Sequence, residues 1–358
     1  MNKRIEHIDI VKGITITLVA MFHSKMKVFI PEIIEPMSLF RMPLFFLVSG
    51  VFFSDQIKPK LFIIKKAEAL LKPYFSVLLL IYFISIFISP LGNPIEELRG
   101  IFYGNGDTIR FGWVPMWFLT HLFAVYCFSY ILFHYASFNK FPFLIKWICL
   151  FLLLTIGTMN IDVFWYKYFP VFGSSVEIPG LPFSMDIIFI SSVFFIAGNI
   201  LKKNILNFIP NNILLSLSII IFLCIAFFTE SYISFNYRIY TNPVFASLGA
   251  ICGIYIMMWI SYLISKNKTI KNIFTVLGSS SLYILIFHFY ISAKIYGFFE
   301  NYIANNVGLF LMSIITFLLS ISLPLIIKWA VNKNSLLALF FLPFKSNKLI
   351  LRMRSVNH

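Results

Sequence analysis

The sequence predicts an all-α, polytopic integral membrane protein, and three observations support this fold class. Hydrophobic residues make up 59% of the 358-residue chain and charged residues only 12%, whereas a soluble domain carries about 25% charged residues. The mean hydropathy is +0.88. Apolar runs recur from Ile8 to Phe344 without a long polar stretch between them. We therefore expect one membrane domain over residues 1–335, followed by a short amphipathic and basic cytoplasmic tail over residues 336–358.

The apolar runs are long enough to cross a bilayer as helices. A transmembrane helix needs about 20 apolar residues, and these runs lack the alternation that the strands of a membrane barrel would show. We therefore expect no strands within them. The pattern predicts about ten transmembrane helices, at 8–28, 38–54, 70–89, 115–135, 141–158, 184–201, 211–228, 244–264, 279–299 and 308–330.

The distribution of charge predicts the orientation of these helices. With ten crossings both termini share one side, which includes Lys3, Arg4 and the basic C-terminal residues. That side carries 21 of the 29 Lys and Arg residues, and the opposite side carries ten of the 14 acidic residues. By the positive-inside rule both termini are cytoplasmic and the protein lies in the inner (plasma) membrane. The net charge of +15 then marks a membrane face, and we expect no nucleic-acid partner.

The cysteines offer no sign of metal or redox chemistry. All four fall inside apolar runs, and their spacing matches neither a metal-ligand pattern nor a redox motif. We expect them to be packing residues and expect no metal site. They are Cys127, Cys149, Cys224 and Cys252.

The first apolar segment carries three ionisable residues, Asp9, Lys12 and His23. Ionisable groups inside membrane helices are costly unless they face a cavity or a partner, so each is a functional candidate. Lys12 and His23 are separated by about three helical turns, or roughly 16 Å, and project from one face together with Asp9. We expect Lys12 near the cytoplasmic mouth and His23 in the outer half. A second interpretation stays open, in which Lys12 snorkels to the surface and His23 hydrogen-bonds within the bundle.

Four segments together resemble a known family. They are IDIVKGITITLVAMFH at 8–23, FRMPLFFLVSGVFF at 40–53, VPMWFLTHLF at 114–123 and LGSSSLYILIFHF at 277–289. In this order they resemble the acyltransferase 3 family, particularly its sugar O-acetyltransferase branch, which is similar to fucose 4-O-acetylases. Many members carry arginine where this chain has Lys12, which keeps the positive charge but loses the planar fork of the guanidinium.

The resemblance implies a membrane-embedded O-acyltransferase. It implies transfer of an acyl group, usually acetyl, from cytoplasmic acyl-CoA to a hydroxyl of a cell-envelope or surface saccharide. Acetyl-CoA would be a donor substrate, so we expect no permanently bound cofactor. The expected partners are the lipid bilayer, acyl-CoA and a saccharide or lipid-linked saccharide acceptor. A multi-helix transporter or flippase of an envelope precursor also fits sparse buried charge, and a structural subunit of an envelope assembly is a third interpretation.

The family's chemistry gives the first-segment residues candidate roles. His23 is the expected general base, because a pKa near ~6.5 allows imidazole to accept a hydroxyl proton at neutral pH. Lys12 is expected to bind CoA phosphates or to stabilise developing negative charge, with Asp9 orienting it. An acetyl-histidine intermediate is an alternative route, which the sequence does not separate from direct transfer.

Three further residues are candidates on the basis of the motifs. Arg41 precedes MPLFF and is expected to contact the acceptor or an acidic partner such as Glu35, unless it is an interfacial anchor. His288 follows the SLYIL pattern and is expected to belong to the site. Trp117 is expected to shape the substrate pocket, whereas the neighbouring His121 is expected to serve packing or hydrogen bonding.

The predicted third-to-fourth and fifth-to-sixth loops are rich in aromatic residues. Such residues can stack against a sugar or form an interfacial belt, and both interpretations stay open. The YGNGD sequence within the first of these loops predicts a turn and no phosphate site. The aromatic residues are Phe102, Tyr103, Trp113, Trp165, Tyr166, Tyr168 and Phe169.

Overall fold

The computed structural model describes residues 6–88, 93–109, 112–171 and 174–343. Several basic residues used in the orientation prediction lie outside these ranges, namely Lys3, Arg4, Lys345, Lys348, Arg352 and Arg354. Of the described residues, 78% are helical, which confirms the all-α membrane fold class. The division into a membrane domain over residues 1–335 and a tail over 336–358 stays a prediction.

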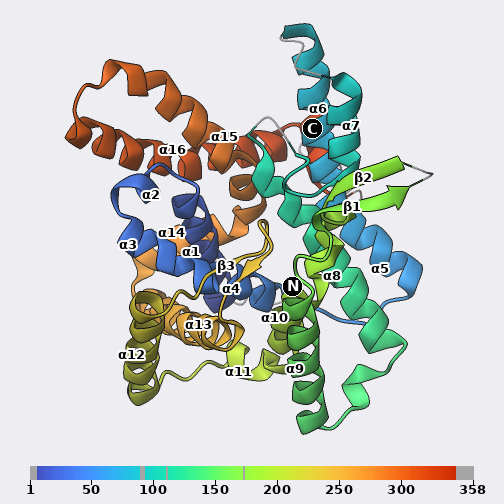
Figure 1. Cartoon of the computed structure of the whole chain (residues 1–358). Helices are drawn as coiled ribbons and strands as arrows, with labels where there is room; N and C mark the ends of the chain where they lie inside the picture. The colour runs from blue at the N-terminus through green and yellow to red at the C-terminus, as the bar shows by residue number, and fades with distance from the viewer. Residues whose placement is uncertain (1–5, 89–92, 110–111, 172–173, 344–358) are drawn as a thin grey trace, which may run out of the picture. The chain divides into compact units, whose positions relative to one another are not determined.

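Each of the ten predicted segments overlaps a helix (Figure 1). By length and composition, seven helical stretches in the described part of the chain can cross a membrane, and α9 and α12 are shorter apolar helices. Helix α1, with 17 residues, is in neither group, so the number of ten crossings stays a prediction. The ten helices are α1 (Glu6–Phe22), α4 (Ser38–Val51), α6 (Lys72–Ile88), α8 (Trp117–His134), α9 (Phe143–Met159), α10 (Ile188–Ile200), α12 (Asn212–Phe228), α13 (Pro243–Lys266), α15 (Ser281–Phe299) and α16 (Asn306–Lys333).

Shorter helical elements connect these ten. Among them α14 is amphipathic and packs directly on α1, and α7 lies within the predicted third-to-fourth loop. The connecting elements are α2 (Met26–Phe29), α3 (Pro31–Ile34), η1 (Glu35–Met37), α5 (Pro59–Lys66), the π-helical η2 (Ala67–Leu71), α7 (Pro94–Tyr103), η3 (Val114–Met116), η4 (Phe138–Lys140), η5 (Pro182–Ile187), α11 (Lys202–Leu206), α14 (Lys268–Ser279) and η6 (Glu300–Tyr302). A further short helix, α17 (Ser335–Phe341), follows α16.

Two small antiparallel sheets that the sequence pattern does not predict lie between the predicted transmembrane segments. Strands β1 (Trp165–Val171) and β2 (Ser174–Pro179) form a hairpin in the predicted fifth-to-sixth loop. Strands β3 (Ile233–Ser234) and β4 (Ile239–Tyr240) form a two-residue ladder. Both sheets are short and local, so they leave the all-α class unchanged.

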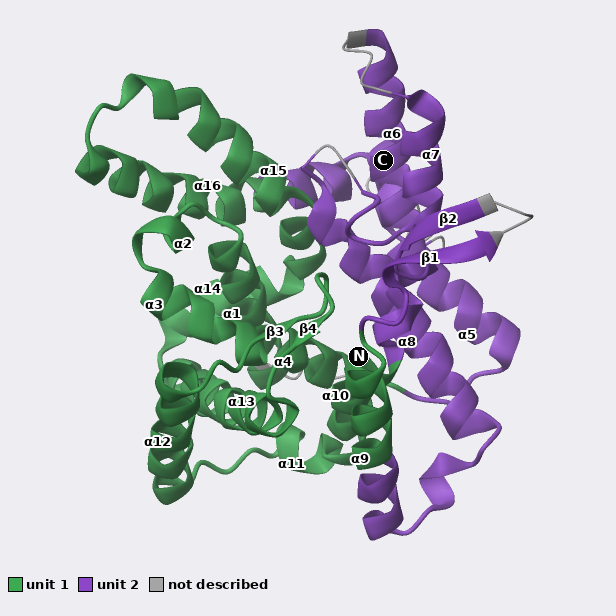
Figure 2. Cartoon of the chain, viewed as in Figure 1, with its two compact units in different colours: residues 1–53, 150–161, 189–325 green, residues 54–149, 162–188, 326–358 purple. Residues whose placement is uncertain are grey.

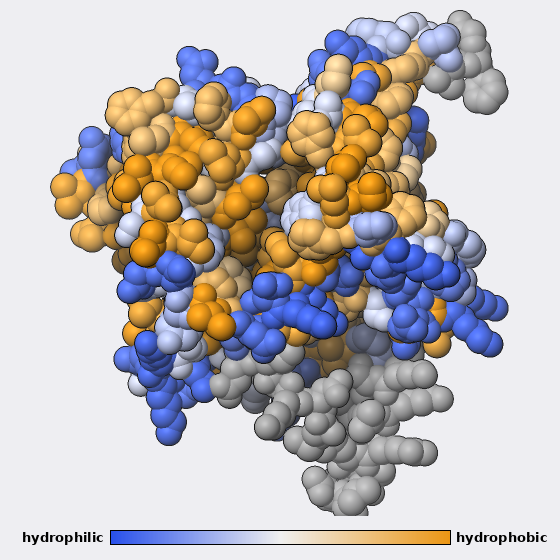
Figure 3. All heavy atoms as spheres, turned by 90° about the horizontal axis from the view of Figure 1, so that it is seen from below, coloured by the Kyte–Doolittle hydropathy of each residue, from blue (hydrophilic) through white to orange (hydrophobic). Residues whose placement is uncertain are grey.

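The chain divides into two compact units (Figure 2). Unit 1 comprises residues 1–53, 150–161 and 189–325, and unit 2 comprises residues 54–149, 162–188 and 326–358. Large apolar side chains are exposed on helices of both units, including Phe228 on α12 and Phe87 on α6, and apolar residues cover much of the face in Figure 3. Exposed apolar surface of this extent indicates a lipid rather than an aqueous surrounding.

In unit 1, glycines bring α1 and α14 into backbone contact. A Cβ atom on Gly13 would overlap the carbonyl of Phe274, and one on Gly278 would overlap the carbonyl of Asp9. Small residues allow membrane helices to approach this closely. The contact fixes the first half of α1, which carries Lys12, against a helix distant in the sequence.

A second pair of glycines joins α4 and α10 in the same way. A Cβ atom on Gly50 would overlap the carbonyl of Phe195, and one on Gly198 would overlap the carbonyl of Leu47. The side chain of Asn199 also donates to the carbonyl of Phe53 at 3.1 Å. These contacts hold α4, the helix that carries Arg41, in a defined position within unit 1.

In unit 2, a turn after α7 is fastened to the hairpin. Helix α7 ends at Tyr103 and is capped by Gly104, whose φ of 68° lies in the left-handed region that glycine tolerates. The next residue, Asn105, is fully buried. Its side-chain oxygen accepts from the backbone N–H of Asp107 at 2.8 Å, and its amide donates to the carbonyl of Pro179 at the end of β2. The YGNGD turn therefore orders the hairpin beside α7.

Candidate functional site

Two histidines predicted from separate motifs come together in unit 1. His23 directly follows α1, and its backbone N–H still bonds to the carbonyl of Val19 at 3.2 Å, so the helical spacing continues to this residue. His288 lies in α15 and is fully buried. The two ring centroids are 5.5 Å apart. His23 is only half-buried, so it is the member of the pair that a substrate can reach.

The hydrogen bonds of His288 define its protonation pattern. Its Nδ1 lies 2.8 Å from the carbonyl oxygen of Ile284 and 3.0 Å from that of Leu285. A carbonyl oxygen only accepts, so Nδ1 carries the proton and Nε2 of the neutral ring keeps its lone pair. Nε2 is buried and has no hydrogen-bond partner among the described residues. A buried polar atom without a hydrogen-bond partner lowers the stability of the fold by about 1–3 kcal/mol. The unpaired Nε2 therefore indicates a place where a ligand or a water molecule binds.

Arg41 lies beside this pair. Its guanidinium carbon is 3.1 Å from the ring centroid of Phe22, and the Phe22 ring is in turn 5.6 Å from the His23 ring. Arg41 is 5% exposed, and its Nε and Nη1 have no hydrogen-bond partner in the part of the chain that the structure describes. The buried cation therefore has donors available for an anionic ligand. We call His23, His288 and Arg41 the histidine cluster.

The expected pairing of Arg41 with Glu35 is not formed among the described residues. Glu35 instead lies 3.5 Å from Lys27. Tyr232, in the loop after α12, is close to Arg41: burial raises the pKa of this phenol, and the positive charge of Arg41 opposes the rise. Glu35 and Tyr232 both line a pocket of about 360 Å³ together with Ser38. The carboxylate of Glu35 therefore lines this pocket from the segment that directly precedes α4.

Lys12 and Asp9 lie on α1, which is unbroken from Glu6 to Phe22. Both side chains are half-buried, and the Lys12 ammonium is 4.6 Å from the ring centroid of Phe52. The helix keeps Lys12 about three turns from His23. The structure therefore does not bring Lys12 into the histidine cluster but aligns it with the cluster along one helix.

Trp117 and His121 belong to unit 2, in the first turns of α8. Trp117 is buried, and its ring centroid lies 5.6 Å from that of His121. The Nδ1 of His121, which is fully buried, lies 3.2 Å from the carbonyl oxygen of Phe183. This contact agrees with the hydrogen-bonding role expected for His121, and the pocket-shaping role of Trp117 stays a prediction.

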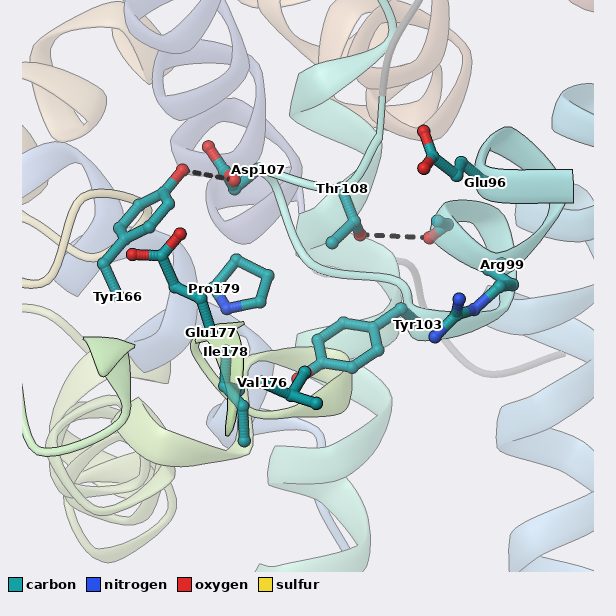
Figure 4. A pocket seen from close by; sticks show the side chains of 11 residues that line it. Glu96, Arg99, Tyr103, Asp107, Thr108, Tyr166, Val176, Glu177, Ile178 and Pro179 are labelled. Carbon is teal, nitrogen blue, oxygen red and sulfur yellow. Dashed lines mark hydrogen bonds between the residues drawn. The ribbon is translucent and has the colours of Figure 1, made fainter. Parts of the chain in front are cut away.

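Unit 2 also contains a pocket of about 600 Å³ between α7 and the β1–β2 hairpin (Figure 4). Two of its lining residues, Tyr103 and Tyr166, are predicted from the sequence only as members of aromatic loops. No sequence motif marks its polar residues, because they come together only once the hairpin forms. We call this cavity the hairpin pocket; its polar lining comprises Glu96, Arg99, Tyr103, Asp107, Thr108, Tyr166 and Glu177.

The histidine cluster has the groups that acyl transfer to a hydroxyl requires. An imidazole nitrogen can accept the hydroxyl proton, and a buried guanidinium can stabilise negative charge that develops on a carbonyl oxygen. In the described ranges, no three His, Cys, Asp or Glu side chains are placed to hold a metal ion.

Comparison with known proteins assigns the family. A family model for an acyltransferase domain, that of the acyltransferase 3 family, matches residues 5–329. No curated protein and no solved structure gives a significant match. The matched region contains the whole histidine cluster, Lys12 and the hairpin pocket. The family match favours a membrane acyltransferase over a transporter. The chain thus belongs to the acyltransferase 3 family.

Proposed function

We propose that this acyltransferase moves an acetyl group from cytoplasmic acetyl-CoA to a hydroxyl of a cell-envelope saccharide. The observation that carries the proposal is the histidine cluster, in which an accessible imidazole, a buried imidazole and a buried guanidinium lie together. The saccharide acceptor, and the similarity to fucose 4-O-acetylases within the sugar O-acetyltransferase branch, rest on the four sequence segments. Acetyl-CoA acts as a substrate and is not bound permanently.

In the proposed reaction His23 is the general base. The acceptor hydroxyl oxygen attacks the thioester carbonyl while its proton passes to a ring nitrogen of His23. A carbon–oxygen bond forms, and the tetrahedral intermediate collapses as the carbon–sulfur bond breaks. The CoA thiolate then takes the proton from the imidazolium. The products are the acetylated saccharide and CoA thiol, and the enzyme returns to its starting state.

His288 acts as a positioning residue in this scheme. Its Nδ1–H is held by backbone carbonyls, so its Nε2 can only accept a hydrogen bond while the ring is neutral. A donor N–H on His23, reached directly or through one water, satisfies that nitrogen. The bond would turn the opposite nitrogen of His23, with its lone pair, toward the acceptor hydroxyl.

Arg41 stabilises the oxyanion in this scheme. A buried charge without a counter-ion is strongly unfavourable, and two nitrogens of this guanidinium lack protein partners among the described residues. The negative charge that forms on the thioester oxygen supplies the missing partner in the transition state. Because the attraction is stronger there than in the ground state, it lowers the barrier.

Lys12 binds the donor on the cytoplasmic side. Its ammonium attracts CoA phosphates, and Asp9 orients it from one turn away on the same helix. With both termini cytoplasmic in the inner membrane, donor and acceptor approach from opposite faces. The extended pantetheine arm of CoA then carries the thioester along α1 toward His23.

The test uses purified protein in sealed, oriented liposomes. Labelled acetyl-CoA on the terminus side should yield labelled saccharide on the opposite side, and His23→Ala should abolish the product. A transporter would move the saccharide without labelling it, which would contradict the proposal. Withholding the acceptor separates the two chemical routes, because an acetyl-histidine mechanism would leave the label on the protein.

A further inference from the structure

The hairpin pocket has a surface chemistry unlike that of the histidine cluster. Three carboxylates and one guanidinium line it, from Glu96, Asp107, Glu177 and Arg99. At neutral pH this lining is net negative, so it disfavours phosphates and acidic sugars. Carboxylates accept hydrogen bonds and the guanidinium donates them. A ligand rich in neutral hydroxyl groups satisfies both kinds of group.

An aromatic ring is presented to this pocket by an unusual backbone feature. The pairing of β1 with β2 shifts register between Trp165 and Lys167, which leaves Tyr166 as the extra residue of a bulge. Tyr166 has a φ of 50°, a left-handed conformation that is unfavourable for a residue other than glycine. Bulges redirect side chains, and strained positions of this kind concentrate at functional sites.

The Tyr166 ring is held in place but remains accessible. Its hydroxyl donates to Asp107 Oδ2, as the dashed line in Figure 4 shows, while 45% of the residue stays exposed. An aromatic face of this kind can stack against the apolar C–H face of a sugar ring, and its polar tip stays hydrogen-bonded. The combination of a stacking platform and surrounding carboxylates is suited to a saccharide.

The opposite wall of the pocket is held together by hydrogen bonds. Thr108 Oγ1 donates to the carbonyl of Gly100 at 3.0 Å, and the Tyr103 hydroxyl donates to the carbonyl of Gly180. Asn105 links the same turn to β2. A preformed wall reduces the ordering cost of binding. A metal ion is a poor alternative ligand, because the three carboxylates of the lining are not placed to hold one ion together, and no other three His, Cys, Asp or Glu side chains in the described ranges are.

We propose that the hairpin pocket binds an uncharged saccharide unit of the acceptor, as a recognition site within unit 2. The proposal rests on the saccharide acceptor of the proposed function and deepens it. The sugar ring stacks on Tyr166, and Glu177 and Glu96 accept hydrogen bonds from its hydroxyls. Because every lining residue belongs to unit 2, the recognition site does not use the side chains of the histidine cluster.

Saccharide binding by the full-length protein in lipid nanodiscs tests the proposal. Saturation-transfer NMR titrations with cellotriose, chitotriose and trigalacturonate measure the affinity for two uncharged trisaccharides and one acidic one. At least one uncharged trisaccharide should bind, more tightly than trigalacturonate. Absence of binding by both uncharged probes, or tighter binding of trigalacturonate, would overturn the proposal.

Matched variants locate the binding. Tyr166→Gly should weaken binding by about tenfold or more, and it should not impair folding because glycine accepts the left-handed backbone. Tyr168→Ala is the control: Tyr168 lies on the same strand and is 67% exposed, but it does not line the pocket. Glu177→Gln should also weaken binding, while Asp162→Asn should not. Equal losses for Tyr166→Gly and Tyr168→Ala would contradict the assignment.

One further variant separates this proposal from the proposed function. His23→Ala should bind the saccharide with unchanged affinity although it transfers no acetyl group. If the wild-type protein binds a saccharide but acetylates nothing, the recognition site stands and the transfer reaction is wrong. If it acetylates a saccharide while Tyr166→Gly leaves binding unaltered, the transfer reaction stands and the recognition site is wrong.

Discussion

The histidine cluster and the hairpin pocket use polar groups in opposite ways. The cluster has few polar groups. Two of them, His288 and Arg41, are buried and carry nitrogens without hydrogen-bond partners among the described residues. The pocket has many polar groups, most of them exposed, and the groups that shape its wall are hydrogen-bonded to one another. The cluster is basic and the pocket is predominantly acidic.

The difference follows from the strength of electrostatic interactions in each surrounding. Two charges about 4 Å apart attract by roughly 1 kcal/mol in water and several times more in a less polar medium. A buried site can therefore act through one or two groups, provided that they are left unpaired until the transition state forms. An exposed site must add up many weak interactions and gains from rigidity instead.

The largest expected effect is that of His23→Ala. General base catalysis contributes about 10²–10⁴-fold, so the rate of acetyl transfer should fall by at least that factor, while expression and membrane insertion stay normal. His134→Ala is the control, because His134 also lies at the end of a transmembrane helix but stacks on Tyr130. Transfer at the wild-type rate by the His23 variant would contradict the proposal that the histidine cluster catalyses acetyl transfer.

Arg41→Met should separate activity from stability. Loss of the oxyanion partner should reduce the turnover rate by about 10²–10³-fold. Removal of a buried, unpaired charge should at the same time raise the thermal midpoint, because a well-packed apolar side chain replaces it. Arg99→Met in the hairpin pocket is the control and should leave the thermal midpoint unchanged, since Arg99 is exposed. A lowered midpoint for Arg41→Met would indicate a structural role.

Substitution of a crossing glycine should destabilise unit 1 without altering its chemistry directly. Gly50→Ala places a methyl group on the carbonyl of Phe195, and overpacking of this kind costs typically about 1–3 kcal/mol. Gly297→Ala is the control, since a Cβ atom there has nothing within 4 Å. The thermal midpoint of the first variant should fall and that of the second should not. Equal midpoints would show that α4 and α10 adjust without cost.

The extent to which each region could be predicted also differs. The helices with long apolar runs were predictable, because a bilayer requires such runs and each can be recognised from its own residues without knowledge of the tertiary structure. His23 and His288 stand out in the sequence for a related reason, because isolated polar residues are rare in such runs, and their roles in the site stay predictions. The hairpin pocket was not, because its acidic lining comes from polar loops in which charged residues are common. Its formation depends on the bulge at Tyr166 and on the Asn105 contacts, which are tertiary features.

The smallest effect is expected at Lys12, and it tests whether the cluster's helix also binds the donor. Lys12→Gln removes the ammonium but keeps a similar length, so the dissociation constant of acetyl-CoA should rise by about tenfold, the effect of losing one partly screened phosphate contact. Lys12→Arg keeps the charge and should stay within about threefold of the wild-type protein, because CoA phosphates accept either cation. Saccharide binding should be unchanged in both variants. Equal acetyl-CoA affinity in all three proteins would contradict the proposal that Lys12 binds the donor. A parallel loss of saccharide binding would indicate that α1 had shifted, and not that a phosphate contact was lost.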